Sequence, residues 1–488
     1  MNNRQSGILL HITSLPSNYG IGSLGKAAYE FIDFLKTSAQ KLWQIFPLGP
    51  TGYGDSPYQT FSAFAGNPLL IDLDELLKNG LLSKSDMKNS IAFNEDKVDY
   101  AFVKEYKNQI YKKAFKNFTP TKDYYDFCTK NNWWLDDFSL FMAIKKHFNN
   151  VSWSEWEIDL RLRKSETISY YQSKLKNEID FEKFLQYLFY QQLDKIKRYA
   201  NENGIKIIGD IPIFVGYDSA DAWAYPEIFL FDDELKPTFV AGVPPDGFSP
   251  TGQLWGNPLY NWQKLKENDY KWWIDRFSHT LKAVDIIRLD HFLGFVNYWQ
   301  VKANEKTAEN GSWQPGPKAH FFETVEKYLG QLPIIAEDLG VITDEVIKLR
   351  EKFGFPGMKI LQFAFYGDEH NPYLPHNIQE NFVVYTGTHD NETTVGWYKN
   401  LPQHIKDYVN RYLKTDGKKI HLDLIKTAWQ TKANYAVAPM QDFLGLDNSA
   451  RMNTPGTTEN NWQWRLNKKH LNDKLTNWIY ELTKNSDR

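Results

Sequence analysis

Three acidic residues each follow a short apolar run, in the segments IIRLDHF, PIIAEDLG and VVYTGTHDN. They are Asp290, Glu337 and Asp390, and successive members lie about fifty residues apart. That distance suits one or two strand-plus-helix units of a (β/α)8 barrel, in which catalytic groups lie where strands end and βα loops begin. Two carboxylates on either side of a sugar bond, with a third beside them, are what glycosidic chemistry requires. The residue types and their spacing therefore predict a carboxylate site for reactions at glycosidic bonds.

The neighbours of the three acids suggest how their roles differ. Alternate residues of a strand share a face, so Arg288 and Asp290 point the same way. A guanidinium group this close favours the ionised carboxylate that a nucleophile needs. Glu337 follows Pro-Ile-Ile-Ala, an apolar setting that would raise its pKa toward that of a general acid. Asp390 follows His389, and this pair could bind adjacent hydroxyl groups of one sugar ring.

Two other roles are open to these acids. A single carboxylate at a strand end is more often part of a buried ion pair or a helix cap, but three together beside Arg288 favour a site. A metal centre is the second possibility, because hard metal ions and Zn²⁺ use ligands of this kind. Its candidate ligands are Asp290, His291, Glu337, Asp338, His389 and Asp390. The guanidinium of Arg288 disfavours a dication beside it, so we expect no metal.

A GxGxxG pattern at Gly20–Gly25 follows a predicted strand and precedes a helical run. A dinucleotide site would need a tight turn directly after the strand and an acidic residue at the end of the second strand. Seven residues, including Pro16, intervene here, and the second strand ends in Pro47-Leu48. We interpret the pattern as a loop and a helix start, and expect no cofactor.

The elements that position the acids alternate along the chain between apolar strand patterns and amphipathic helical patterns. Such alternation implies a parallel sheet, and eight strands imply a closed barrel. The predicted fold class is therefore α/β, a (β/α)8 TIM barrel. The strand candidates are Gly7–Ile12, Leu42–Leu48, 205–214, Ala283–Asp290, Pro333–Glu337, Met358–Phe363, Phe382–Thr386 and Tyr435–Ala438.

Two stretches, about residues 50–200 and 215–280, are too long to be single βα connections. Phe102, Tyr106 and Ile110 keep helical spacing within the first stretch. We expect both stretches to be large, mainly helical insertions at the C-terminal mouth of the barrel. Neither a repeat nor a Pro/Gly-rich linker divides the chain, so residues 1–488 are predicted to form a single catalytic barrel.

The composition limits the class of protein. Of the 488 residues, 42% are hydrophobic and 24% charged, which is typical of a globular protein. The formal net charge of −3 provides no basic surface for nucleic acid or membranes, and no segment approaches the ~20 apolar residues of a membrane span. The single cysteine, Cys128, excludes an internal disulfide, and the apolar run after Met1 is too short for a signal peptide. We expect a cytoplasmic protein without nucleic-acid or membrane partners, and the sequence carries no sign of its oligomeric state.

The chain closely resembles a known family, the 4-α-glucanotransferases called amylomaltases or disproportionating enzymes, which are relatives of the α-amylases. The likeness lies in DIIRLDHFLG, IIAEDLG and TGTHDNETTVGW, and also in LPSNYGIGSLG, GYGDSPYQ, IGDIPIFV, GVPPDGFSPTGQLWGNP and NTPGTTENNWQWR. It extends from about residue 7 to about residue 466 in the family's motif order, which makes it specific. The resemblance implies an enzyme that acts on maltodextrins and other α-1,4-glucans.

The resemblance also implies a role for each candidate residue. Asp290 matches the family's nucleophile, Glu337 its acid/base and Asp390 its transition-state stabiliser. Further positions match residues that contact the glucan: Arg288, His291, His389 and Asp210 around the reacting glucose, Tyr58 at the bottom of the cleft, Gln253 and Trp255 in a covering loop, and Asn461 toward the donor side.

The covering loop departs from the family pattern at two positions. Many members have an aromatic residue where this chain has Gly247, and often an acidic residue where it has Pro250. A glycine would loosen the loop and remove a sugar contact. We expect this difference to affect acceptor preference and product size, but not the chemistry.

The mechanism implied is a two-step retaining transfer through a covalent glycosyl-enzyme, with the two carboxyl groups about 5–5.5 Å apart. An α-1,4-glucan hydrolase would use the same three acids and differ only in admitting water, and the resemblance favours the transferase. A non-catalytic glucan-binding protein would tolerate the loss of one acid, whereas this chain retains all three.

Overall fold

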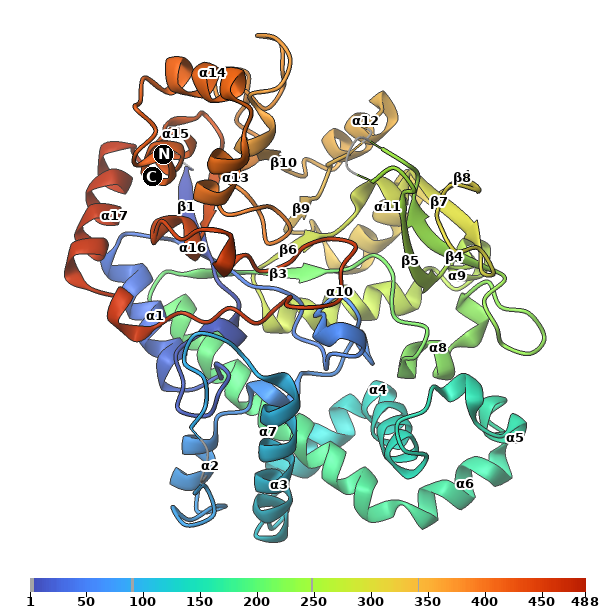
Figure 1. The fold of residues 1–488 in the computed structure, drawn as a ribbon. Coiled ribbons are helices and arrows are strands. Elements are labelled where there is room, and N and C mark those ends of the chain that lie inside the picture. Colours follow the sequence, from blue (N-terminus) through green and yellow to red (C-terminus); the bar gives the residue numbers. More distant parts are fainter. Residues whose placement is uncertain (1–3, 89–91, 247–248, 341) are drawn as a thin grey trace.

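The computed structural model describes residues 4–88, 92–246, 249–340 and 342–488. Eight parallel strands form one sheet in the order β10-β11-β12-β1-β2-β3-β6-β9. Figure 1 shows these strands around the centre of the molecule, with helices outside them. The strands are β1 (Gln5–Leu9), β2 (Leu42–Gln44), β3 (Lys206–Ile211), β6 (Ile286–Leu289), β9 (Ile334–Ala336), β10 (Gly357–Ile360), β11 (Phe382–Tyr385) and β12 (Tyr435–Pro439). Each lies within or overlaps a predicted strand, and the predicted barrel fold is confirmed.

Most strands end earlier than the apolar runs that predict them, because the last residues of each run turn into the mouth of the barrel. In the second run, β2 stops at Gln44 and the backbone N–H of Phe46 is bound by Nδ1 of His11 at 3.0 Å. Phe46 is buried although it lies outside the strand, because its ring packs against His389. This apolar run therefore contains both a strand, Leu42–Gln44, and buried residues that follow it at the mouth of the barrel.

The sheet closes between β9 and β10 through few bonds. Ala336 N–H donates to the carbonyl of Pro356 at 2.8 Å. The carboxylate of Asp338 accepts a bond from Met358 N–H at 2.7 Å, and Nε of Arg350 lies 3.2 Å from its other oxygen. Asp338 is thus a structural residue of this seam.

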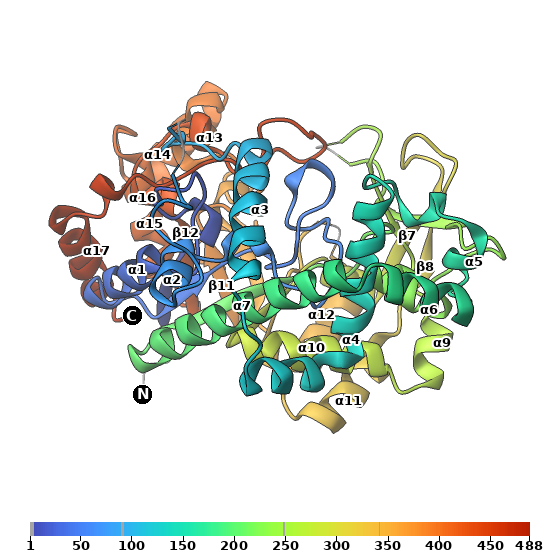
Figure 2. The same cartoon turned by 90° about the horizontal axis from the view of Figure 1, so that it is seen from below.

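Helices surround the barrel on the outside. The long helix α7 packs against β3 and against its neighbours α1 and α10; it crosses most of the view in Figure 2. Its buried residues include Leu185, Leu188 and Ile196, which recur at helical spacing on one face. The helices that follow barrel strands or close the chain are α1 (Lys26–Thr37), α7 (Lys176–Glu202), α10 (Lys271–Ala283), α11 (Lys318–Leu329), α12 (Asp344–Lys352), α13 (Thr394–Asn400), α14 (Gln403–Leu413), α15 (Ile420–Gln430), α16 (Met440–Phe443) and α17 (Asp473–Asn485).

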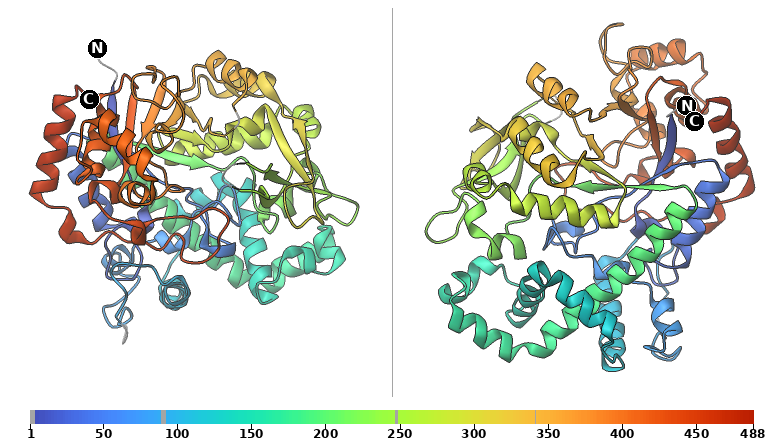
Figure 3. Two further views of the ribbon diagram at one scale, coloured as in Figure 1. Left: turned by 45° about the horizontal axis from the view of Figure 1, so that its top comes forward. Right: turned by 180° about the vertical axis from the view of Figure 1, so that it is seen from behind.

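The chain between β2 and β3 adds a group of helices beside the barrel, which Figure 3 shows standing away from the strands. Buried Lys145 anchors this group, because its ammonium lies 2.5 Å from Asp218 in the loop after β3. The helices are α2 (Leu73–Lys78), α3 (Tyr100–Lys116), α4 (Lys122–His147), α5 (Ile158–Arg161) and α6 (Ser165–Lys174), and α8 (Ala220–Ala224) and α9 (Trp262–Glu267) follow after β3.

A second, four-stranded antiparallel sheet was not predicted. Its order is β5-β4-β7-β8, with β4 (Phe239–Val243), β5 (Gln253–Pro258), β7 (Asn297–Lys302) and β8 (Gly311–Pro315). The sheet has only a small core of its own, formed by Val240, Val301 and Ala308. Polar residues interrupt β5, β7 and β8, and Gly and Pro occur in the loop between β4 and β5, so these three strands lack the continuous apolar run of the barrel strands.

The two ends of the chain lie close together, as the N and C labels in Figure 1 show. Nη1 of Arg488 donates to the carbonyl of Gln5 at the start of β1, at 3.2 Å. No helix within the described part of the chain is long and apolar enough to cross a membrane.

Candidate active site

The guanidinium of Arg288, on β6, joins two carboxylates at the mouth of the barrel. Its Nη1 lies 2.8 Å from Asp210 on β3 and 2.9 Å from Asp290. The Arg288 and Asp210 side chains are buried, whereas 29% of the Asp290 side chain is exposed. The backbone N–H of Asp290 donates to the carbonyl of Ile211 at 3.0 Å. This bond continues the pairing with β3 by one residue beyond the end of β6 and fixes the position of Asp290 at the barrel mouth. The predicted alignment of Arg288 with Asp290 is confirmed.

Asp210 is the buried ion-pair partner of Arg288. Burial raises its pKa to about 6, against the opposing effect of Arg288. The hydroxyl group of Tyr58 donates to the same carboxylate at 2.9 Å. Asp210 thereby connects the loop that carries Tyr58 with the arginine beside Asp290.

Glu337 follows β9 and faces the same cleft. Its pKa is well above the ordinary range because the carboxyl group is withdrawn from water and lies near Asp290. The direction expected from the Pro-Ile-Ile-Ala run is confirmed. One carboxylate oxygen accepts the backbone N–H of His291 at 2.7 Å. His291 has a left-handed backbone conformation, with φ of 52°, which is uncommon for a residue other than glycine.

The side chain of His291 has a ring nitrogen, next to Trp255, that is unpaired within the described part of the chain. Burial lowers its pKa to about 4, so the imidazole is neutral near pH 7. Its Nε2 is buried and has no hydrogen-bond partner among the described residues. Its ring lies edge-on to Trp255 of β5, with 4.8 Å between ring centroids, and Trp255 Nε1 donates to Gln253. The second sheet thus brings Gln253 and Trp255 to the barrel mouth.

Asp390 lies in the loop after β11. His389 Nε2 is 3.3 Å from one carboxylate oxygen, and Asn453 Nδ2 donates to the other at 2.6 Å. Loss of water contact alone would raise the pKa of Asp390, but His389, Asn453 and Arg288 lower it to about 2. The Asp390 side chain is 45% exposed, so an ionised carboxylate faces the cleft.

Aromatic rings form the floor of the cleft. Tyr58 stacks on His389 with 5.0 Å between ring centroids, and Phe46 lies 4.9 Å from the same histidine. Trp462 contacts all three rings. Flat rings with polar edges suit the faces of sugars.

The remaining sequence candidates lie at the edge of this site. The Asn461 side chain is engaged within its own loop: its oxygen accepts Thr454 N–H at 3.0 Å, and its nitrogen donates to the Thr457 carbonyl at 2.9 Å. Pro250 is exposed in the loop between β4 and β5. Gly247 lies outside the described residues.

The structure therefore connects most of the predicted residues through direct contacts at the mouth of the barrel, and adds two that the sequence analysis missed. Phe46 was assigned only to a strand. Asn453 lies 63 residues beyond Asp390, so no local spacing connects them. The candidate ligands of the disfavoured metal centre do not converge: Asp338 belongs to the β9–β10 seam, and within the described ranges no group of three or more His, Cys, Asp or Glu residues is arranged to hold an ion.

Comparisons with known proteins agree with this arrangement. A family model described as 4-alpha-glucanotransferase matches residues 10–471. The chain is 48% identical over 481 residues to a 4-alpha-glucanotransferase of Clostridium butyricum, covering 97% of this chain and 99% of the relative. It is also 48% identical to a 4-alpha-glucanotransferase of Synechocystis sp., covering 99% of this chain and 98% of that one. The amylomaltase of Streptococcus agalactiae, solved in complex with acarbose, superimposes with a TM-score of 0.97 at 43% identity, over 99% of both chains.

Proposed function

The chain belongs to the 4-alpha-glucanotransferase family and is a glycosyltransferase of that kind, and from this premise we propose how its cleft performs the transfer. The donor and the acceptor are maltodextrins or other α-1,4-glucans. Asp290 is the nucleophile, Glu337 the acid/base and Asp390 the stabiliser of the transition state. The observation that carries these roles is the different environment of each acid. Asp290 lies against Arg288, and Glu337 accepts one backbone N–H. Asp390 lies between His389 and Asn453, and the pKa of Glu337 is raised whereas that of Asp390 is lowered.

In the first step, an Asp290 carboxylate oxygen attacks the anomeric carbon while the bond to the glycosidic oxygen breaks. Glu337 gives its proton to that oxygen, and the shortened glucan leaves. The product is a β-linked glycosyl-enzyme with Glu337 ionised. We expect the two carboxyl groups to act across about 5–5.5 Å, the separation of retaining enzymes.

In the second step, Glu337 takes the proton of the 4-hydroxyl group of another glucan. That oxygen attacks the anomeric carbon and displaces Asp290, which restores the α-configuration and the initial protonation of Glu337. In both steps, the ionised Asp390 carboxylate stabilises the flattened, oxocarbenium-like sugar more than the ground state.

We assign substrate contacts to the side chains that surround these acids. The unpartnered Nε2 of His291 supports a bond to the reacting glucose, and His389 and Tyr58 provide the surface beneath it. The contact of Trp255 with His291 supports a role for the second sheet in covering the glucan. The further contacts in this assignment are Asp210, Arg288, Gln253 and Asn461.

We further propose that the barrel and its inserted segments, about residues 50–200 and 215–280, work as one catalytic unit in cytoplasmic carbohydrate metabolism. The single cysteine, Cys128, supports a reducing compartment because the chain cannot form an internal disulfide.

Incubation with maltotriose tests the function, with chain lengths and reducing ends followed together. We expect glucose and a ladder of longer maltodextrins, while the total number of reducing ends stays constant. A rise in reducing ends without longer products would show that water is the acceptor and that the protein is a hydrolase.

A further inference from the structure

Asp390 is held by a residue from a distant part of the chain. Asn453 donates its side-chain N–H to Asp390 Oδ1 at 2.6 Å, and its backbone N–H to the carbonyl of His389 at 3.1 Å. Asn453 therefore binds both members of the His389–Asp390 pair. A carboxylate held at one oxygen by Asn453 and approached at the other by His389 has little freedom to rotate.

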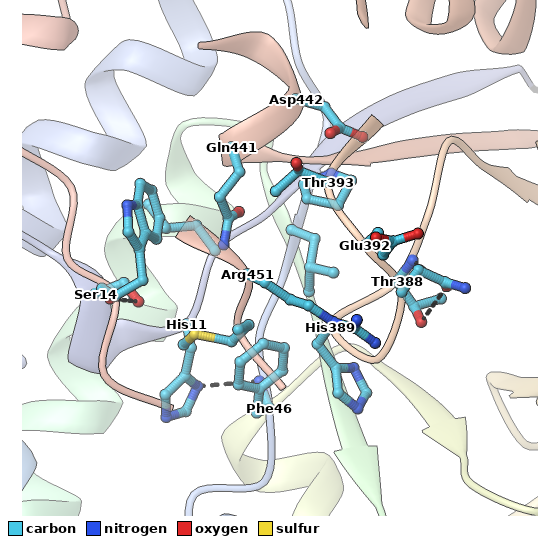
Figure 4. A pocket seen from close by; sticks show the side chains of 16 residues that line it. His11, Ser14, Phe46, Thr388, His389, Glu392, Thr393, Gln441, Asp442 and Arg451 are labelled. Atoms are coloured by element: carbon cyan, nitrogen blue, oxygen red, sulfur yellow. Dashed lines mark hydrogen bonds between the residues drawn. The ribbon is translucent and has the colours of Figure 1, made fainter. Parts of the chain in front are cut away.

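Arg451 fixes the backbone on both sides of this contact. Its Nη2 donates to the carbonyl of Asp390 at 2.6 Å, and its Nε donates to the carbonyl of Asn453 at 2.8 Å. Arg451 and His389 both line the pocket shown in Figure 4. Arg451 thus provides a second connection, besides the Asn453 side chain, between the segment of Asn453 and the loop of Asp390.

The first and last residues of the segment 453–462, here called the 453–462 loop, both contact the His389–Asp390 pair. Its ends are joined where Trp462 N–H donates to the carbonyl of Met452 at 2.7 Å. Trp462 then packs against His389, with 5.7 Å between ring centroids. The tip, residues 455–460, is exposed, whereas Trp462 is buried.

From these contacts we propose that Asn453 is a positioning residue, which directs the Asp390 carboxylate toward the reacting glucose and couples the 453–462 loop to it. This inference rests on the proposed function. It assigns to the loop an effect on turnover in addition to any contact with the glucan.

The groups around Asp390 determine how readily its carboxyl group ionises. His389 faces it from its own loop, Arg288 from β6 and Arg451 at its backbone carbonyl. The side chain of Asn453 donates an amide N–H that does not titrate, and this hydrogen bond helps to lower the pKa of Asp390. An acidic side chain in its place would put two carboxylates together, and such a pair tends to share a proton.

The test compares Asn453→Ala and Asn453→Asp with Asn268→Asp, a matched charge change at the exposed C-terminal cap of α9. Rates of maltotriose disproportionation are measured across pH. We expect Asn453→Ala to lower kcat by about 10- to 100-fold, the effect of losing a hydrogen bond to a charged group, with KM changed less. Asn453→Asp should lower kcat further and move the acid limb of the pH profile to higher pH. Asn268→Asp should match the wild type.

Two results would overturn the inference. One is a kcat within about twofold of the Asn268→Asp control in both Asn453 variants, a difference too small for a lost charged hydrogen bond. The other is a lower kcat in Asn453→Asp with an unmoved acid limb, which would indicate a purely structural role. Wild-type enzyme in the same assay separates this from the proposed function: if it fails to lengthen maltotriose, the function itself is wrong.

Discussion

At the scale of single residues, the proposed roles depend on the different surroundings of chemically similar groups. Glu337 and Asp390 are both carboxylic acids, yet burial raises the pKa of one and a set of polar neighbours lowers that of the other. Arg288 pairs with Asp290 and Asp210. Glu337 instead accepts a hydrogen bond from the backbone N–H of His291. A proton donor and an ionised stabiliser can thus coexist at one pH.

The acid role of Glu337 predicts a selective rescue. Glu337→Gln cannot protonate a glycosidic oxygen, so turnover of maltotriose should fall by about 10²- to 10⁴-fold, the usual contribution of general acid catalysis. An α-maltosyl fluoride donor has a leaving group that departs without a proton. Its first step, measured as fluoride release in a single turnover, should remain near the wild-type rate and lose its basic limb. An equal loss with both donors would contradict the acid role.

The raised pKa of Glu337 also predicts a pH-dependent effect on stability. Because its pKa is higher in the folded than in the unfolded protein, its contribution is fully present below the ordinary glutamate pKa and is lost as the pH rises through the folded value. Glutamine has no proton to lose. Relative to the wild type, Glu337→Gln should therefore gain free energy of unfolding between pH 4 and pH 9, as measured by urea denaturation. A constant difference between the two proteins across this range would argue against a buried, protonated Glu337.

At the scale of elements, the sequence predicted the barrel strands well and the second sheet not at all. Buried strands such as 205–214 are continuous runs rich in isoleucine, which indicate a strand without reference to partners. The strand Gln253–Pro258 has no such run and is held by pairing with Phe239–Val243. Pairings of this kind depend on distant residues, so local periodicity cannot show them.

The seam between β9 and β10 predicts a site of unusual sensitivity. Asp338→Ala would leave the Met358 N–H without its acceptor and remove the nearer carboxylate of the buried Arg350, which would keep only the exposed Glu351 at 3.6 Å. Breaking a buried ion pair by removing one partner typically costs about 3–5 kcal/mol, and we expect a loss of this size in the free energy of unfolding. Exposed Asp233→Ala is the matched control. Equal urea midpoints for the two variants would show that the seam does not depend on Asp338.

At the scale of the whole molecule, the site is assembled from segments that only the complete fold brings together. Asp290 and Glu337 lie at the ends of neighbouring strands, and the spacing of their apolar runs was enough to predict their proximity. The contact of Trp255 with His291 and that of Asn453 with Asp390 depend on loops whose paths have no period. Strand-end residues of the site were therefore predictable from physical patterns, and loop contributions came only through resemblance or from the structure.

The measurement that tests the account most directly is the site of the covalent intermediate. Glu337→Gln is mixed with α-maltotriosyl fluoride, so that the first step proceeds while the second lacks its base, and the protein is then digested and examined by mass spectrometry. We predict a maltotriosyl group on the peptide that contains Asp290, and none in the Asp290→Asn/Glu337→Gln double variant. A glycosyl group on another residue, or fluoride release with inverted product and no adduct, would contradict a retaining transfer through Asp290.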